Sequence, residues 1–335
     1  MLVVVGHLIS TVRTDTEFGF ALYAYIYLFH MPAMIALSGL FLKPKVTPKA
    51  INSTVQLLVA WLAWEGIWAV MRGLVEGKQL SQSFLVTPSW TLWFLVTLAT
   101  MRILLPYIAR LKHPLLVSTA LALIAPLSPA IGVEFSAART LAFLPFFVGA
   151  WLARERGWFS REWFATPNGA VRAAAWGLLV SVALGLTALA LTPAGLKGSW
   201  RIDRWLTHRD SYAWMFDNAP LGAWNANGPG VVGWFGLAAG GMLVGAILVA
   251  VAAAMTLALL LVVPRKRSVF TVWGARTLSV YLLHGVVVWA LRGSGFVDAV
   301  GSLGWIGIVL LSLVAVAIAA VLSTRIVSRV FGPII

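Results

Sequence analysis

The sequence has no cysteine and few charged residues. Without cysteine it has no disulfide framework, iron–sulfur cluster or thiolate metal site. Charged residues make up 11% of the chain, whereas a soluble domain carries about 25%. Acids are the scarcest, with 11 Asp and Glu against 25 Lys and Arg. The shortage of charge excludes a soluble globule with a wetted surface.

Apolar residues dominate instead, at 60% of the 335 residues, and the mean hydropathy is +0.90. A helix needs about 20 apolar residues to cross the hydrocarbon of a bilayer. Stretches that approach this length are Leu22–Leu42, Ile51–Met71, Trp90–Pro106, Leu115–Val133, Arg139–Ala153, Val171–Leu191, Val231–Val263, Val269–Leu291 and Leu303–Val327. We predict an all-α, polytopic membrane helix bundle that forms one domain over residues 1–335.

A further apolar stretch, Met1–Val12, is too short to span a bilayer at a rise of 1.5 Å per residue. We expect it to be the end of a first transmembrane helix, and the native protein to begin about 10–20 residues upstream. The fold prediction is therefore about ten transmembrane helices, the first truncated at its N-terminus.

The net charge of +14 is compatible with a nucleic-acid partner, but its distribution favours another explanation. With the N-terminus in the cytoplasm, the cytoplasmic connections hold fourteen basic residues and the others nine. The dense clusters Lys43–Lys49, Arg154–Arg161 and Arg265–Arg267 all fall on the cytoplasmic side, as the positive-inside rule requires. We predict a multi-pass plasma-membrane protein with both termini cytoplasmic, embedded in a lipid bilayer, and no nucleic-acid partner.

Ionisable residues at membrane depth are costly and are often functional. The predicted helices contain His7, His30, Glu65, Arg102, Arg139, Arg276 and His284. The three histidines lie roughly 8–12 Å below the outer surface, and Arg102 and Arg276 lie near inner helix ends. Imidazole is a base near neutral pH and arginine suits phosphate. The pattern indicates a base in the outer half and a phosphate site in the inner half.

Structural roles are open for the same residues. His30 precedes Pro32 and could bond a carbonyl freed by the proline. Arg102 and Arg276 could extend to the interface, and Glu65 could pair with an arginine. No spacing of histidines or carboxylates predicts a metal site. The longest connection, Pro193–Gly230, holds either interfacial aromatic residues or a platform for a sugar or lipid-linked acceptor: Trp200, Trp205, Tyr212, Trp214, Phe216 and Trp224.

Several strings carry a resemblance to a known family. They are VVVGHLI (Val3–Ile9), YIYLFHMPAMIALSGLF (Tyr25–Phe41), SWTLWFLVTLATMRILLP (Ser89–Pro106), and RTLAFLPFFVGAWL (Arg139–Leu152) with RTLSVYLLHG (Arg276–Gly285). In this order and at these separations, the chain resembles the membrane acyltransferase 3 family, specifically its fucose 4-O-acetylase-like branch.

The resemblance implies ten helices and transfer of an acyl group, usually acetyl, from cytoplasmic acetyl-CoA to a hydroxyl of an extracytoplasmic glycan or glycolipid. It also implies that His7 is the catalytic residue, with an arginine ahead of it at a separation that runs past Met1. We expect His7 to act as the base with help from His30. The acceptor-binding prediction is Trp93, Arg139, Tyr281 and His284, and the acyl-CoA-binding prediction is Arg102 and Arg276.

Two other functions fit the sequence. One is a transporter or flippase for a glycan or carboxylate, with the histidines as a proton relay. The other is a truncated product without activity of its own. An assay of acyl transfer in detergent separates the enzyme from the carrier, because only the carrier needs two compartments.

Overall fold

A computed structural model describes residues 1–196, 198, 200–221 and 230–331, and Trp224 of the long connection lies outside these ranges. The regular structure of the described residues is entirely helical. The longer helices are α1 (Leu2–Ile9), α2 (Glu17–Leu40), α3 (Pro48–Glu76), α4 (Trp93–Ile108), α5 (Pro114–Ile124), α6 (Ala137–Glu155), α8 (Gly169–Ala190), α12 (Gly230–Val262), α14 (Thr277–Gly293) and α16 (Trp305–Leu322). The shorter elements are α7 (Glu162–Ala165), α9 (Pro193–Leu196), α10 (Ile202–Trp205), α11 (Tyr212–Asn218), α13 (Val269–Gly274), α15 (Phe296–Gly301), α17 (Arg325–Val330) and 3₁₀ turns at Ala125–Leu127, Glu134–Ser136 and Trp158–Ser160.

Within the described ranges, six helices are long and apolar enough to cross a membrane: α2, α3, α6 with its preceding turn, α8, α12 and α16. Three shorter apolar helices, α4, α5 and α14, accompany them. The 16 residues of α4 extend only about 24 Å at 1.5 Å per residue. The all-helical membrane protein is confirmed, whereas the count of about ten transmembrane helices stays a prediction.

Two predicted stretches are interrupted. The stretch Leu115–Val133 leaves α-helical geometry after Ile124, where Pro126 and Pro129 supply no backbone N–H for a continuing helix. The stretch Val269–Leu291 divides into α13 and α14, and α13 ends at Gly274, a residue type that weakens helices. Arg276 therefore precedes α14 as its N-cap.

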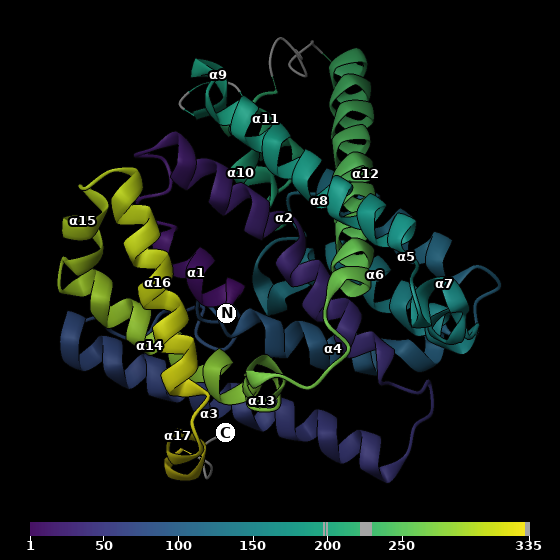
Figure 1. Ribbon diagram of the computed structural model, residues 1–335, viewed down its shortest axis with the longest axis horizontal. Coiled ribbons are helices and arrows are strands. Elements are labelled where there is room, and N and C mark those ends of the chain that lie inside the picture. Colours follow the sequence, from purple (N-terminus) through teal and green to yellow (C-terminus); the bar gives the residue numbers. More distant parts are fainter. Residues whose placement is uncertain (197, 199, 222–229, 332–335) are drawn as a thin grey trace.

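Helix α2 runs diagonally through the middle of the molecule, with α1 and α14–α16 on one side and α6, α8 and α12 on the other (Figure 1). Its start is fixed by Thr16, whose hydroxyl accepts from the Gly19 N–H at 3.0 Å. Along its length, Ile26 packs in a core cluster with α1 and α16, Phe29 in one with α8 and α12, and Ile35 in one with α4 and α6. Each of these three core clusters therefore depends on α2.

On one face of the molecule, connections distant in sequence hold one another. Arg13, after α1, pairs with Asp203 of the α8–α12 connection at 2.9 Å. The Phe135 N–H, before α6, donates to the Val86 carbonyl, before α4, at 2.7 Å. These four segments belong to the set that alternation of the predicted spans places outside.

The other connections contact each other in the same way. Arg154, at the end of α6, donates to the carbonyl of Leu40 at 3.0 Å, at the end of α2. Arg265, after α12, donates to the Phe164 carbonyl at 2.9 Å, in the α6–α8 connection. Each of these contacts therefore joins connections from the same one of the two sets expected from the sequence. The second set carries the dense basic clusters.

Candidate active site

Two histidines from opposite ends of the chain meet in the interior. The His7 Nδ1 of α1 lies 3.1 Å from the His284 Nε2 of α14, and the ring centroids are 5.1 Å apart. His7 is 9% exposed and His284 is fully buried. The rings of His7 and His284, which were predicted to lie at one depth in separate helices, therefore face each other and are shielded from lipid.

A tryptophan and an arginine complete the surroundings of His7. The Trp90 ring stacks with the imidazole, with centroids 5.0 Å apart, and the Arg292 guanidinium carbon lies 4.7 Å from the Trp90 ring centre. Arg292 also donates to the His7 carbonyl and to the Ser10 hydroxyl, the latter at 2.5 Å. Neither Trp90 nor Arg292 was predicted to belong to the site. Trp90 does lie in the family-like string that begins at Ser89.

The third histidine, His30, belongs to the same cluster. Its ring centroid lies 4.8 Å from that of Tyr27, which lies 6.4 Å from that of His7. The His30 Nδ1 is 2.7 Å from the Ile26 carbonyl. That carbonyl differs from the one that Pro32 frees, which is four residues before the proline, at Leu28. His30 is 4% exposed, so all three rings lie inside the protein.

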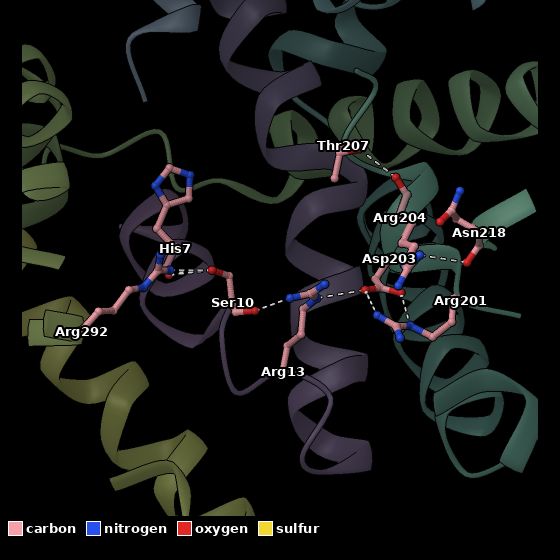
Figure 2. A network of polar contacts seen from close by, with 9 residues as sticks. All are labelled: His7, Ser10, Arg13, Arg201, Asp203, Arg204, Thr207, Asn218 and Arg292. Carbon is pink, nitrogen blue, oxygen red and sulfur yellow. Dashed lines mark hydrogen bonds and ion pairs between the residues drawn. The ribbon is translucent and has the colours of Figure 1, made fainter. Parts of the chain in front are cut away.

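A charged network links α1 to the outer connection (Figure 2). Arg13 donates to the Ser10 carbonyl and to Asp203, and Arg201 donates to both oxygens of Asp203 at 2.8 and 2.9 Å. Burial acts to raise the pKa of Asp203, but the hydrogen bonds from Arg201 and the charge of Arg13 hold that pKa below its usual value. The carboxylate is therefore charged and satisfied.

Arg139 and Trp93 form a second cluster. The Arg139 guanidinium lies 4.6 Å from the Trp93 ring centre, and its Nε donates to the Thr207 carbonyl at 3.1 Å. Trp93 stacks with Phe143, whose ring centroid lies 5.0 Å from that of His208. Burial, assisted by the charge of Arg139, lowers the pKa of His208 to about 4. The predicted acceptor residues Trp93 and Arg139 are thus in contact with each other.

The segment before α4 is held by two polar side chains, the half-buried Tyr281 and the buried Glu65. The Tyr281 hydroxyl donates to the Thr91 carbonyl. Glu65 accepts from the Trp61 Nε1 at 3.0 Å and from both the N–H and the hydroxyl of Ser89, at 2.5 and 2.7 Å. Glu65 therefore pairs with neutral donors, and together with Tyr281 it fixes the position of the segment that carries Trp90.

The two arginines predicted to bind acyl-CoA contact different elements. The Arg102 Nη1 donates to the Ser53 carbonyl of α3 at 3.2 Å, while its buried Nε has no hydrogen-bond partner. The Arg276 Nη1 donates to the Ser323 carbonyl after α16 at 2.6 Å. Both lie toward the basic face, and their roles stay predictions.

The aromatic residues of the outer connection are mostly core. Trp205 contacts the rings of Tyr212 and Phe216, with centroids 6.1 and 5.2 Å away, and all three are buried. Trp200 is 43% exposed and is available to a ligand or a membrane interface. Packing within the connection therefore accounts for most of this aromatic content.

An open polar groove of about 340 Å³ adjoins the His7 cluster on the outer side. Its lining includes Arg72, Lys78, Ser89 and Trp90. Because Trp90 also stacks on His7, one side chain borders both the groove and the histidine cluster. Among the described residues, no group of three or more His, Asp or Glu side chains could hold a metal ion.

The chain has no significant match among curated proteins or among solved structures. The model of the acyltransferase 3 family, which describes an acyltransferase domain, matches residues 1–324, nearly the whole chain. The matched residues include both His7 and His284. The chain therefore belongs to the acyltransferase 3 family and is an acyltransferase.

Proposed function

We propose that this acyltransferase is an O-acyltransferase of the plasma membrane, of the fucose 4-O-acetylase-like branch. It moves an acyl group, with acetyl as the default, from cytoplasmic acyl-CoA to a hydroxyl of an extracytoplasmic carbohydrate or glycolipid. The face that carries the dense basic clusters is the cytoplasmic one. The observation that carries the proposal is the buried His7, which is separated from an outer polar groove by the ring of Trp90.

The chemistry requires a base at the acceptor hydroxyl. The imidazole of His7 removes the hydroxyl proton, and the oxygen attacks the carbonyl carbon of the thioester. The carbon–sulfur bond then breaks, and the CoA thiolate takes the proton back from His7. A route through an acyl-histidine uses the same residues, and rapid-quench trapping of labelled acyl on the protein separates the two.

The donor enters from the opposite face. Arg276 lies eight residues before His284 on the chain, which is about 12 Å along the axis of α14. Arginine side chains at that level suit the CoA phosphates, with the thioester arm reaching up to His7. His30 assists from the far side of the Tyr27 ring, which lies between it and His7 in the chain of ring contacts. Trp93, Arg139, Tyr281 and His284 border the acceptor side.

The test is transfer from radiolabelled acetyl-CoA by the purified full chain in detergent, with fucose and a panel of other hexoses as acceptors. His7→Ala should abolish transfer, whereas His113→Gln, at an exposed histidine outside the site, should leave it intact. Transfer by His7→Ala at the wild-type rate would show that the base lies elsewhere. Mapping the acetylated oxygen identifies the acceptor position.

A further inference from the structure

The hydrogen bonds of His284 fix which of its ring nitrogens carries hydrogen. Its Nδ1 lies 2.9 Å from the Val280 carbonyl and 2.7 Å from the Tyr281 carbonyl, both on its own helix. Carbonyl oxygens only accept, so this nitrogen must be the donor. A neutral imidazole has a single N–H, and the Nε2 of His284 is therefore a bare acceptor.

The position of the hydrogen on the His7 ring follows from that on His284. The His284 Nε2 lies 3.1 Å from the His7 Nδ1, and a hydrogen bond between two ring nitrogens needs one hydrogen. Since His284 has none to give there, the Nδ1 of His7 donates it. His7 then keeps its lone pair on Nε2, the nitrogen that faces away from His284.

Other contacts hold the two rings in this relation. The Trp90 ring stacks on His7 with an interplanar angle of 25°, which fixes the plane of the imidazole. A Cβ on Gly285, next to His284, would lie 3.1 Å from the Thr91 hydroxyl and 3.2 Å from the Trp68 ring. Helix α14 therefore packs closely against Thr91 and Trp68 beside His284. Arg292, further along α14, binds the His7 carbonyl.

His30 provides a contrast within the same cluster. Its Nδ1 also lies against a main-chain carbonyl, that of Ile26, so its Nε2 is likewise a bare acceptor. Among the described residues, however, no second imidazole bonds to His30. In the part of the chain that the structure describes, only His7 and His284 connect a main-chain carbonyl through two rings to a nitrogen lone pair.

We infer that His284 is a positioning residue that holds His7 in the tautomer with its lone pair on Nε2, and that it shares the positive charge when His7 takes a proton. In the transfer step, the hydroxyl proton goes to the His7 Nε2, and the Nδ1 hydrogen is shared with the His284 Nε2. Return of the proton to the leaving thiolate restores both neutral rings. The inference rests on the proposed function, in which His7 is the base.

A pair of substitutions tests the role of His284. His284→Asn keeps a group at the level of Nδ1 but has no atom at the level of Nε2, whereas His284→Gln extends an amide oxygen to that level. We expect His284→Asn to lower kcat about 10²-fold or more, because the orienter of a general base is lost. The KM for acetyl-CoA should stay unchanged, and the KM for the acceptor, whose side His284 borders, should change by a much smaller factor than kcat. His284→Gln should recover part of the lost rate, because its oxygen accepts from His7 without being able to take up a proton.

Nitrogen-15 NMR of histidine-labelled protein gives a readout independent of turnover. The wild-type His7 should show a protonated Nδ1 and a bare Nε2, and His284→Asn should move hydrogen to Nε2. A bare Nδ1 on His7 in the wild type would overturn the inference, and so would an unchanged kcat in His284→Asn while His7→Ala is inactive. If His7→Ala is itself active, the proposed function fails instead.

Discussion

Arg13 and Asp203 are 190 residues apart and form an ion pair at 2.9 Å, in which the Asp203 side chain is fully buried. Arg13 follows α1 closely and also binds the Ser10 carbonyl, while Asp203 lies in α10 of the outer connection. The segment that carries the candidate base is therefore fastened to the connection that covers the outer face. Asp203 is the shared partner, because Arg201 binds the same carboxylate.

Asp203→Asn should destabilise the protein by about 2–4 kcal/mol, because the substitution leaves two partly buried guanidinium groups without their counter-charge. The apparent melting temperature in detergent, followed by tryptophan fluorescence, measures the effect. Asp217→Asn is the matched control, since Asp217 is exposed on α11. Equal melting temperatures for the two variants would show that the ion pair contributes nothing to stability.

Arg292→Lys should lower kcat about 10-fold or more. The Arg292 Nη2 donates to both the His7 carbonyl and the Ser10 hydroxyl, while the guanidinium carbon lies 4.7 Å from the Trp90 ring centre. Lysine keeps the charge but not the planar group that makes all these contacts together, and one charge-assisted hydrogen bond contributes about 1.5–3 kcal/mol. Steady-state kinetics with acetyl-CoA measure the loss, and Arg329→Lys, exposed on α17, serves as control. If both variants turn over like the wild type, Arg292 does not position His7.

Local patterns in the sequence predicted most of the long helices and a shared level for His7 and His284, which lie 3.1 Å apart. The run of apolar residues from Leu22 onward predicted α2, and the positions of His7 and His284 near the outer ends of their helices predicted that they share a level. The length of α5 was overestimated, because apolar residues continue past Pro126 whereas the helical backbone hydrogen bonds do not.

Contacts between distant segments were not predictable in this way. The predicted stretch that contains His284 ended at Leu291, so Arg292 was counted among the charges of a connection, whereas the structure places it in the last turn of α14. The partners of Glu65 were open for the same reason, because Ser89 reaches it only through the packing of α4 on α3. Residues that are paired by helix packing have no characteristic separation in the sequence by which the pair could be predicted.

Gly39→Ala should destabilise the protein, because a Cβ at this position would overlap the main-chain carbonyl of Phe147, where α2 meets α6. A main-chain atom cannot move aside as the end of a side chain can, so the two helices must separate. Gly66→Ala in α3 is the control, since a Cβ there meets nothing within 4 Å and alanine favours helix by about 1 kcal/mol. Opposite shifts of the melting temperature are expected, and a neutral Gly39→Ala would contradict the close contact.

The packing around His208 should weaken in mild acid. The pKa of His208 is about 4 in the folded protein and about 6.5 when unfolded, so below pH 6.5 the unfolded state binds a proton that the folded state does not. Stability is therefore lost as the pH falls from 6.5 toward 4, by about 2 kcal/mol at pH 5. The melting temperature of His208→Gln should change less than that of the wild type between pH 7 and 5. His113→Gln should retain the full change, and an identical pH profile for all three proteins would exclude His208 as the cause.

Arg276→Gln should raise the KM for acetyl-CoA more than the KM for the acceptor, because a phosphate contact acts only on the donor. The Ser323 carbonyl already uses one nitrogen of Arg276, so a purely structural role is the competing explanation. Acetyl-pantetheine separates the two, because it carries the thioester without the nucleotide phosphates. If Arg276 binds phosphate, the substitution changes the KM for acetyl-CoA and leaves that for acetyl-pantetheine unaltered. If Arg276 only anchors the end of α16, both donors suffer equally and the melting temperature falls, which would remove Arg276 from the donor site.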